Sequence, residues 1–228
     1  MNDNLVHRLR EIQTTIPSHV RLIAVSKTVP LEAMVMVYGE GIRDFAENKL
    51  QDAIAKQEQL KDFSDICWHF IGHLQTNKAK KAIECFSWIH SVDSLKLAQK
   101  LDTYSQQALD EKVITDLPQI CLQVKILPDE NKHGWSISQL YEDLETLKSF
   151  KYLNIRGLMT ILPLGLSSDE ILSAFAQARD LLENIKDSFN SNFDQLSMGM
   201  SGDYLLAIEA GATMVRLGTI IFGDRKPY

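Results

Sequence analysis

A lysine stands at the point where an apolar segment ends. Residues 22–25 form the run Leu-Ile-Ala-Val, and Ser26 and Lys27 follow it directly. If the run is a buried strand, the Lys27 amine lies at its carboxyl end and is partly desolvated, which favours the neutral, nucleophilic form. Such an amine can form a Schiff base with a carbonyl compound. A lysine that begins a solvated loop explains the same pattern equally well.

Two glycine-containing loops near the end of the chain could bind an anion. The segment 197–202 is small and polar and leads toward a short helical segment, and Gly218-Thr219 follows a later apolar run. Backbone N–H groups and the Ser201 hydroxyl at such turns can hold a phosphate. Each loop taken alone could equally be an ordinary glycine turn.

Arg216 lies inside the apolar segment 214–217. A charge within a core strand needs a partner. Two interpretations stay open on this pattern, because the guanidinium could face the ring or acid group of a ligand, or it could pair with a buried carboxylate.

Other reactive residue types give weaker signals. His69, His73 and His90 lie near expected strand ends, but no metal-binding spacing links them, so we predict no metal site. The three cysteines are scattered, without a CxxC pair, and are expected to be reduced thiols in apolar surroundings. No Walker A, GxSxG or GxGxxG motif occurs. A net charge of −6 argues against nucleic-acid binding over a broad basic surface.

The elements that would position these residues alternate along the chain. Short β-branched or aromatic segments, typical of strands, occur at 20–25, 44–47, 67–72, 88–92, 120–126, 155–160, 195–198 and 214–217. Helical spacing of apolar residues occupies 31–38, 49–60, 94–109, 137–147 and 170–185, with shorter segments after Gly72 and at 204–209. Strict alternation predicts parallel strands with right-handed crossovers.

Eight strand segments favour an α/β fold of the closed (β/α)8 type, a TIM barrel, and residues 4–13 predict an extra helix before the first strand. An open doubly wound sheet is the alternative. No linker-like stretch interrupts the pattern, so we expect one domain over residues 1–228. In such a barrel, sites form where strands end, and phosphate is commonly held by the loops after strands seven and eight.

Several of these strand ends resemble the YggS/PROSC family of pyridoxal-phosphate (PLP) homeostasis proteins, which includes PLPBP and PipY-like proteins. The matching segments are AVSKT at 24–28, FAEN at 45–48, WHFIG at 68–72, LQTNK at 74–78, GLM at 157–159, LSMGMS at 196–201 and VRLGTIIFG at 215–223. Ala46 departs from the usual glycine of the family, and His73 stands where the family often has proline or serine.

The resemblance implies a barrel like that of bacterial alanine racemase, with fold type III PLP binding. It also implies a covalent aldimine between PLP and Lys27, and an Arg216 that faces the pyridine nitrogen. Ser201, Gly218 and Thr219 would hold the phosphate, and Asn48 and Met200 would complete the cofactor-binding set.

The implied site favours a carrier over a robust enzyme. An arginine facing the ring nitrogen disfavours its protonation and weakens the ring as an electron acceptor. The pattern also shows no second base opposite Lys27 and no covering domain. We therefore expect a PLP-binding protein of vitamin B6 and amino-acid/keto-acid homeostasis. A low-activity amino-acid racemase or lyase is the alternative.

The same interpretation predicts where the protein acts and with what. The N-terminus lacks a secretory h-region and no apolar run is long enough to span a membrane, so we expect a cytoplasmic protein. A cofactor site complete within one chain predicts a monomer. The expected partners are PLP itself and possible acceptors such as apo PLP-enzymes or a regulatory protein, with neither nucleic acid nor membrane.

Overall fold

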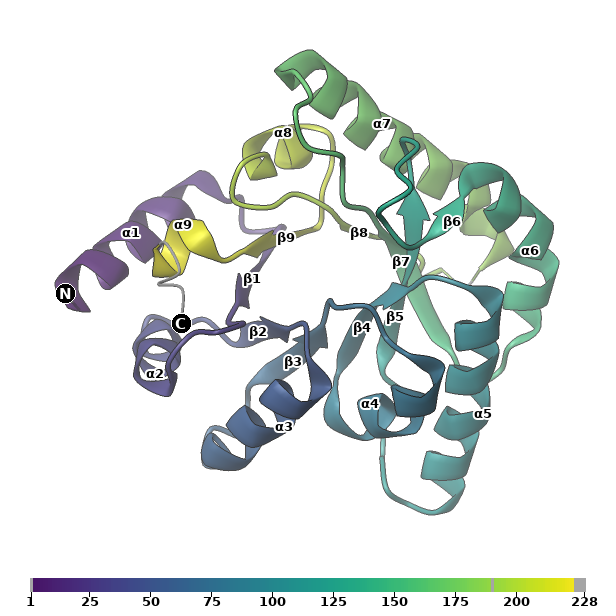
Figure 1. Cartoon of the computed structure of the whole chain (residues 1–228), viewed down its shortest axis with the longest axis horizontal. Helices are drawn as coiled ribbons and strands as arrows, with labels where there is room; N and C mark the ends of the chain where they lie inside the picture. The colour runs from purple at the N-terminus through teal and green to yellow at the C-terminus, as the bar shows by residue number, and fades with distance from the viewer. Residues whose placement is uncertain (1, 190, 224–228) are drawn as a thin grey trace.

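Eight parallel strands form a closed ring in the computed structural model, which describes residues 2–189 and 191–223 (Figure 1). The ring strands are β1 (Arg21–Val25), β2 (Asp44–Glu47), β3 (Cys67–Phe70), β4 (Trp88–Val92), β5 (Gln119–Lys125), β7 (Asn154–Met159), β8 (Gln195–Ser197) and β9 (Met214–Leu217). Strand β9 pairs with β1, with Leu22 opposite Val215, and β4 pairs with β5. These pairings close the ring, so the predicted (β/α)8 barrel is confirmed and the open sheet is excluded.

One strand was not predicted. The two-residue strand β6 (Trp135–Ser136) pairs with β5 beside the barrel, with Trp135 opposite Val124. A two-residue element carries too little alternation to be recognised in the sequence. The ring strands themselves start and end within about two residues of the expected positions, the usual uncertainty of such boundaries.

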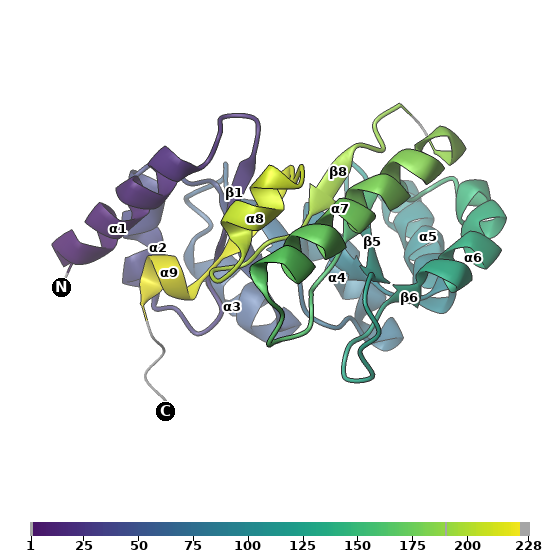
Figure 2. The ribbon, with the colours of Figure 1, turned by 90° about the horizontal axis from the view of Figure 1, so that it is seen from above.

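Helices cover the outside of the ring, as the two orthogonal views show (Figures 1 and 2). They are α2 (Leu31–Gly39), α3 (Leu50–Gln59), α4 (Ala79–Cys85), α5 (Leu95–Asp110), α6 (Ile137–Ser149), α7 (Ser168–Ile185), α8 (Tyr204–Glu209) and α9 (Thr219–Phe222), with 3-10 turns η1 (Thr76–Lys78) and η2 (Lys186–Ser188). The expected extra helix is α1 (Asn2–Thr15), which packs against α2 and α9. No helix within the described residues is long and apolar enough to cross a membrane.

Local sequence explains where several helices begin. The Ser94 hydroxyl accepts a hydrogen bond from the Leu97 N–H at the start of α5. Ser136 with Gln139, and Ser167 with Glu170, form capping boxes at the starts of α6 and α7. Each cap satisfies backbone donors that a helix start leaves unpaired. These polar residues therefore fix where the chain turns from a strand end into the following helix.

Side-chain alternation along the strands divides the core in two. Most buried apolar residues pack between the strands and the helices. A smaller cluster fills the inside of the barrel: Ile23, Val25, Ala46, Trp88, Cys121, Met159 and Met214. In β9, Val215 and Leu217 belong to the outer core, whereas Met214 belongs to the inner cluster. Because successive residues of a strand face opposite sides, Arg216 points into the barrel with Met214.

Candidate functional site

The predicted site residues meet at one mouth of the barrel. Lys27 follows β1, Asn48 follows β2, Met200 and Ser201 follow β8, and Gly218 and Thr219 follow β9. The ring order β8-β9-β1-β2 makes these four strands neighbours. Since all strands are parallel, their carboxyl ends open on the same side, which we call the C-terminal mouth. The structure thus brings together segments that are up to about 190 residues apart in sequence.

The two glycine-containing loops are joined through Ser201. Its Oγ accepts hydrogen bonds from the Gly218 and Ile220 N–H groups, both at 3.4 Å. These distances are long for N–H···O bonds, so the two donors are only weakly engaged. In the first loop, the Met200 N–H donates to Asp203 Oδ1 at 2.6 Å. The Gly218 and Ile220 N–H groups thus face the Ser201 hydroxyl, whereas the Met200 N–H faces Asp203. Backbone donors gathered beside a hydroxyl are groups that an anion site can use.

Two glycines are needed where the loops are closest. A Cβ on Gly72 would lie 2.0 Å from the Asn48 carbonyl oxygen, so the backbone after β3 packs directly against the residue after β2. Gly199 has φ +91°, and a Cβ there would lie 2.6 Å from Ala207 Cβ. Any larger residue would displace these loops. The shape of the mouth therefore depends on both positions.

A buried ion pair lies directly beside the segment that carries Lys27. Glu47 Oε1 accepts from the Ser26 hydroxyl and from Lys56 Nζ, both at 2.7 Å, and Lys56 Nζ also donates to the Ser26 carbonyl oxygen at 2.6 Å. The Glu47 side chain is fully buried and that of Lys56 is 13 % exposed. Ser26 is thus held from both its side chain and its backbone. The half-buried Lys27 follows it as the first residue of a turn.

Arg216 is a buried cation inside the barrel. It is 3 % exposed, its Nη1 donates to Ser197 Oγ at 2.7 Å, and its Nη2 donates to the Thr160 carbonyl oxygen at 3.0 Å. Burial lowers its pKa to about 10, against a smaller opposing effect of Asp203. The guanidinium therefore stays charged at neutral pH. Its described hydrogen bonds go to a hydroxyl and a carbonyl, and not to a buried carboxylate.

Two buried oxygen atoms at the C-terminal mouth lack a hydrogen-bond partner within the described residues. Glu47 Oε2 lies at the end of β2, and Thr160 Oγ1 directly follows β7. Such atoms are rare in proteins because an unpaired buried polar group is destabilising. Unsatisfied acceptors and donors close to Lys27 and Arg216 fit a polar ligand that would complete the mouth.

Sequence analysis alone assigned no role to Glu47, Lys56 or Thr160, and it placed Ser197 at the start of the anion-binding segment 197–202 and not as a partner of Arg216. For Glu47 a signal existed, since it is a charge at the end of the strand segment 44–47, much as Arg216 is a charge inside the segment 214–217. Lys56 lies on α3 among other polar residues, so its position in the sequence gives no comparable signal. Its role follows from the direction in which the helix packs.

The remaining reactive residues lie elsewhere. All three cysteines are free thiols; Cys121 is buried and Cys67 and Cys85 are half-buried. Burial raises the pKa of Cys67 to about 11 and that of Cys121 to about 12, so these thiols are poor nucleophiles at neutral pH. That the thiols are reduced stays a prediction, and Cys67 departs from the expected apolar surroundings because it lies beside Asp44 and His69.

Two groups of side chains have the composition of a metal site, with donor atoms within 4.8 Å of one another: Asp44, Cys67 and His69, and His73, Asp93 and His133. In the first group, the Arg21 guanidinium lies 3.6 Å from Asp44 Oδ1 and already supplies a positive charge. In the second, the two imidazole rings stack 3.7 Å apart at 13°, so their lone pairs lie in nearly parallel planes and do not converge. The absence of a metal site stays a prediction.

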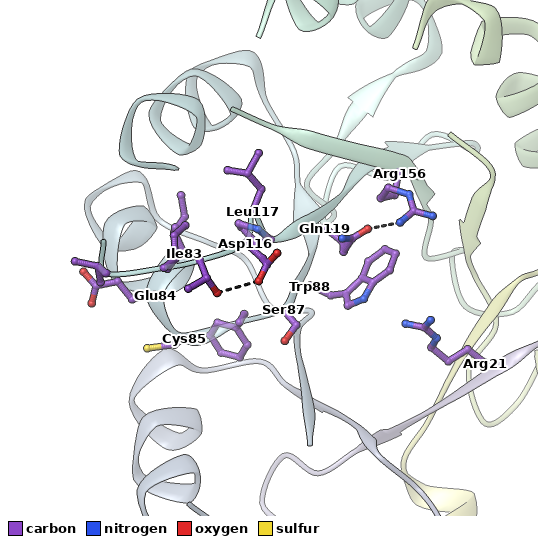
Figure 3. Close-up of a pocket in the computed structure, with 15 residues that line it drawn as sticks. Arg21, Ile83, Glu84, Cys85, Ser87, Trp88, Asp116, Leu117, Gln119 and Arg156 are labelled. Atoms are coloured by element: carbon purple, nitrogen blue, oxygen red, sulfur yellow. Dashed lines mark hydrogen bonds between the residues drawn. The ribbon is translucent and has the colours of Figure 1, made fainter. Parts of the chain in front are cut away.

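The opposite end of the barrel, the N-terminal mouth, carries a hollow of about 620 Å³ (Figure 3). Trp88 lies at this end, and the guanidinium carbons of Arg21 and Arg156 are 5.4 and 5.8 Å from the centre of its ring. Arg156 also donates to Gln119 Oε1 and to the Asn192 carbonyl oxygen. Because this end of the barrel lies opposite the C-terminal mouth, the hollow is away from every predicted site residue. Its volume is nevertheless large enough for a small ligand.

The fold and the C-terminal mouth together define a class of protein. The family model described as "Alanine racemase, N-terminal domain" matches residues 2–226. The alanine racemase of E. faecalis superposes with a TM-score of 0.72 over 98% of this chain and 58% of its own, at 16% identity, which shows the shared fold.

Closer relatives narrow this class. The "Pyridoxal phosphate homeostasis protein" of Synechocystis is 51% identical over 215 residues, 94% of this chain and 96% of that protein. The structure of PipY from Synechococcus elongatus, with PLP bound, has a TM-score of 0.89 and 44% identity, and covers 96% of this chain and 100% of PipY. The chain belongs to the family of pyridoxal phosphate homeostasis proteins, and the resemblance seen in the sequence is confirmed.

Proposed function

We propose that the protein binds PLP at the C-terminal mouth and serves vitamin B6 and amino-acid/keto-acid homeostasis as a carrier of the cofactor. The observation that carries the proposal is the convergence of an amine, a buried guanidinium and backbone donors on neighbouring strand ends. PipY, 44% identical to this chain, was determined with PLP bound. The oxygens of Glu47 and Thr160 that have no partner among the described residues lie at the same mouth, so the residues present fit a polar cofactor.

Lys27 is the proposed point of covalent attachment. PLP supplies an aldehyde that reacts with amines and a ring that accepts electrons. The Lys27 Nζ would provide the amine, at the carboxyl end of β1. Ser26, held by Glu47 and Lys56, fixes the backbone from which Lys27 extends. This arrangement limits the conformational entropy that Lys27 loses when it is held in one position.

The phosphate group would bind where the loops after β8 and β9 meet. Ser201 Oγ, the Gly218 N–H and the Thr219 hydroxyl are the proposed donors, with Met200 forming the wall of the β8 loop. The hydrogen bonds that Ser201 now accepts at 3.4 Å are weak enough to be exchanged for stronger ones to an anion. Asn48, whose backbone packs against Gly72, would bound the site on the β2 side.

Arg216 is the proposed neighbour of the ring nitrogen. It has no acceptor atom and stays charged at neutral pH, so it would donate a hydrogen bond to an unprotonated nitrogen. The positive charge would also keep a proton off that atom. A ring held in this state is a weak electron acceptor, which favours storage and delivery of PLP over rapid turnover.

We further propose that the protein acts as a monomer in the cytoplasm and passes PLP to apo-enzymes. All proposed cofactor contacts come from one chain. Sedimentation should give the mass of one chain both with and without PLP. A tight dimer that forms only with PLP would contradict this part of the proposal.

The experiment that tests the cofactor site is reduction of the PLP-loaded protein with borohydride, followed by peptide mass spectrometry. We expect the fixed label on Lys27. The variant Lys27→Ala should carry no fixed label while retaining weaker, reversible PLP binding through the phosphate loops and Arg216. Lys96→Ala, which removes an exposed lysine of α5, is the control and should label normally. A label that persists in Lys27→Ala would place the attachment on another lysine.

The carrier role is tested separately from binding. PLP-loaded protein is incubated with free amino acids while enantiomers, amines and keto acids are followed, and then with an apo PLP-enzyme while its activity is followed. We expect activation of the apo-enzyme and little turnover of amino acids. Turnover in the usual enzyme range, about 1–10³ per second, would instead establish a racemase or lyase.

A further inference from the structure

A continuous row of polar side chains crosses the otherwise apolar inside of the barrel. From Arg216 Nη1 the contacts run to Ser197 Oγ at 2.7 Å, and from Ser197 Oγ to His90 Nδ1 at 2.8 Å. They continue from His90 Nε2 to His69 Nδ1 at 2.8 Å, and from His69 Nε2 to Asp44 Oδ1 at 2.9 Å. His69, His90 and Ser197 are fully buried. The row joins the cofactor side of the barrel to its N-terminal mouth.

The two ends of the row determine the direction of every hydrogen bond in it. Asp44 as a carboxylate only accepts, so His69 Nε2 must carry a hydrogen. A neutral His69 then accepts at Nδ1, which requires a hydrogen on His90 Nε2. A neutral His90 accepts at Nδ1 in turn, so the Ser197 hydroxyl donates to it and leaves a lone pair for Arg216. Arg216 can only donate, and the opposite end therefore agrees.

The surroundings of His69 and His90 favour the neutral rings that these hydrogen-bond directions require. Burial lowers the pKa of His69, although Asp44 opposes the effect. Burial also lowers the pKa of His90 well below its usual value, and the positive charges of Arg216 and Arg21 act in the same direction. Burial therefore favours the neutral form of both rings.

We propose that Asp44, His69, His90 and Ser197 are positioning residues that hold Arg216 through a one-way hydrogen-bond chain, and so set how its guanidinium is presented to a ligand at the C-terminal mouth. Each member turns its acceptor atom toward Arg216 and its donor toward Asp44. The negative ends of the dipoles thus point at the buried cation and offset part of its desolvation. That the ligand is PLP rests on the proposed function.

The first test needs no cofactor. In apo-protein labelled with ¹⁵N-histidine, NMR should show His69 and His90 as neutral rings protonated at Nε2, unchanged between about pH 8 and pH 6. Exposed His19, which lies outside the row, is the internal control. A hydrogen on Nδ1 of either buried ring, or a charged ring in this range, would overturn the directional chain.

The second test asks whether the chain restrains Arg216. Rotation of the guanidinium is followed by NMR of its Nη groups, which should be resolved and slow in the apo wild type. Ser197→Ala and His90→Gln should both speed the rotation. Ser91→Ala removes an equally buried hydroxyl, which donates to the Gly72 carbonyl oxygen outside the chain, and should leave the rotation unchanged. Equal effects of Ser91→Ala and Ser197→Ala would overturn the proposal.

The third test connects the chain to the cofactor. Loss of one net hydrogen bond predicts about a three- to tenfold rise in the PLP dissociation constant for Ser197→Ala and for His90→Gln, and none for Ser91→Ala. In an Arg216→Gln background the effect of Ser197→Ala should vanish, because it acts through Arg216. Persistence of the full effect there would overturn the proposal. If PLP does not bind at all, the proposed function fails. The two tests on the apo-protein would still show whether the hydrogen-bond chain holds Arg216.

Discussion

The two mouths of the barrel contain similar residue types in opposite physical states. At the C-terminal mouth, Glu47 and Lys56 pair at 2.7 Å with little exposure, and both also bond Ser26. At the N-terminal mouth, Arg156 and Asp194 approach only to 3.6 Å, and the Asp194 side chain is 62 % exposed. The N-terminal mouth nevertheless carries the hollow of about 620 Å³.

This difference shows that a hollow by itself does not mark the site. At the N-terminal mouth the Arg156–Asp194 pair is partly solvated, and such pairing contributes little. The C-terminal mouth holds buried charges, weakly engaged backbone donors and two oxygens that find no partner in the part of the chain that the structure describes. Buried polar groups are destabilising unless something satisfies them. The mouth where they gather is therefore the one that a ligand would complete.

The largest difference between the mouths should appear in folding stability. Glu47→Gln removes the carboxylate that faces Lys56 and leaves a largely buried cation unpaired, so the free energy of unfolding should fall by about 3 kcal/mol. Asp194→Asn is the matched change at the N-terminal mouth and should alter it by at most about 1 kcal/mol. Urea denaturation of both variants measures the contrast. Equal losses would mean that burial does not distinguish the two pairs.

Acid should destabilise the interior that connects the mouths. Because burial lowers the pKa of His69 and His90, the unfolded chain binds protons that the folded chain excludes. The free energy of unfolding should thus fall as the pH drops below about 6.5. One pH unit lower, the loss should reach up to about 1.4 kcal/mol per histidine. Urea denaturation at pH values between about 8 and 5.5 gives the slope of the free energy of unfolding against pH. This slope should be smaller in His69→Gln, and a slope equal to that of the wild type would contradict the prediction.

Ligand affinity should respond only at the C-terminal mouth. Ser201→Ala and Thr219→Ala each remove one donor to a charged phosphate, worth about 1.5–3 kcal/mol. Since backbone donors remain, we expect the low end, about a tenfold weaker PLP affinity for each variant. Thr115→Ala, in the N-terminal hollow, is the control. Unchanged affinity in the double variant Ser201→Ala/Thr219→Ala would move the phosphate site elsewhere.

The smallest effect is expected from the arginine of the hollow. Arg156→Gln removes a cation beside Trp88, yet it lies at the far end of the barrel from Lys27. PLP affinity measured by titration should stay within about twofold of the wild type. A larger change would show that the two mouths are coupled through the barrel, and the contrast drawn between them would then be incomplete.

Sequence patterns predicted the repeating part of this protein. Alternation of strand and helix segments is local, so it is visible in one sequence and predicts parallel strands. Parallel strands place their carboxyl ends together, and this rule alone brought Lys27, Ser201 and Gly218 to one mouth. Their cofactor role stays a prediction. The count of eight strand segments favoured a closed ring, but the pairing of β9 with β1 that closes it joins segments nearly 200 residues apart and is seen only in the structure.

The contacts that define the site's chemistry were decided by tertiary structure. The sequence showed Arg216 as a charge that needs a partner, and left the partner open. The pairing of β8 with β9 placed Ser197 beside it, and the closed barrel set His90 against Ser197 across 107 positions of the chain. His69 and His90 looked like residues near strand ends, whereas they lie within β3 and β4 and point into the barrel. Residue type and spacing along one strand are local properties, but a hydrogen bond between strands depends on register and curvature, which only the closed barrel fixes.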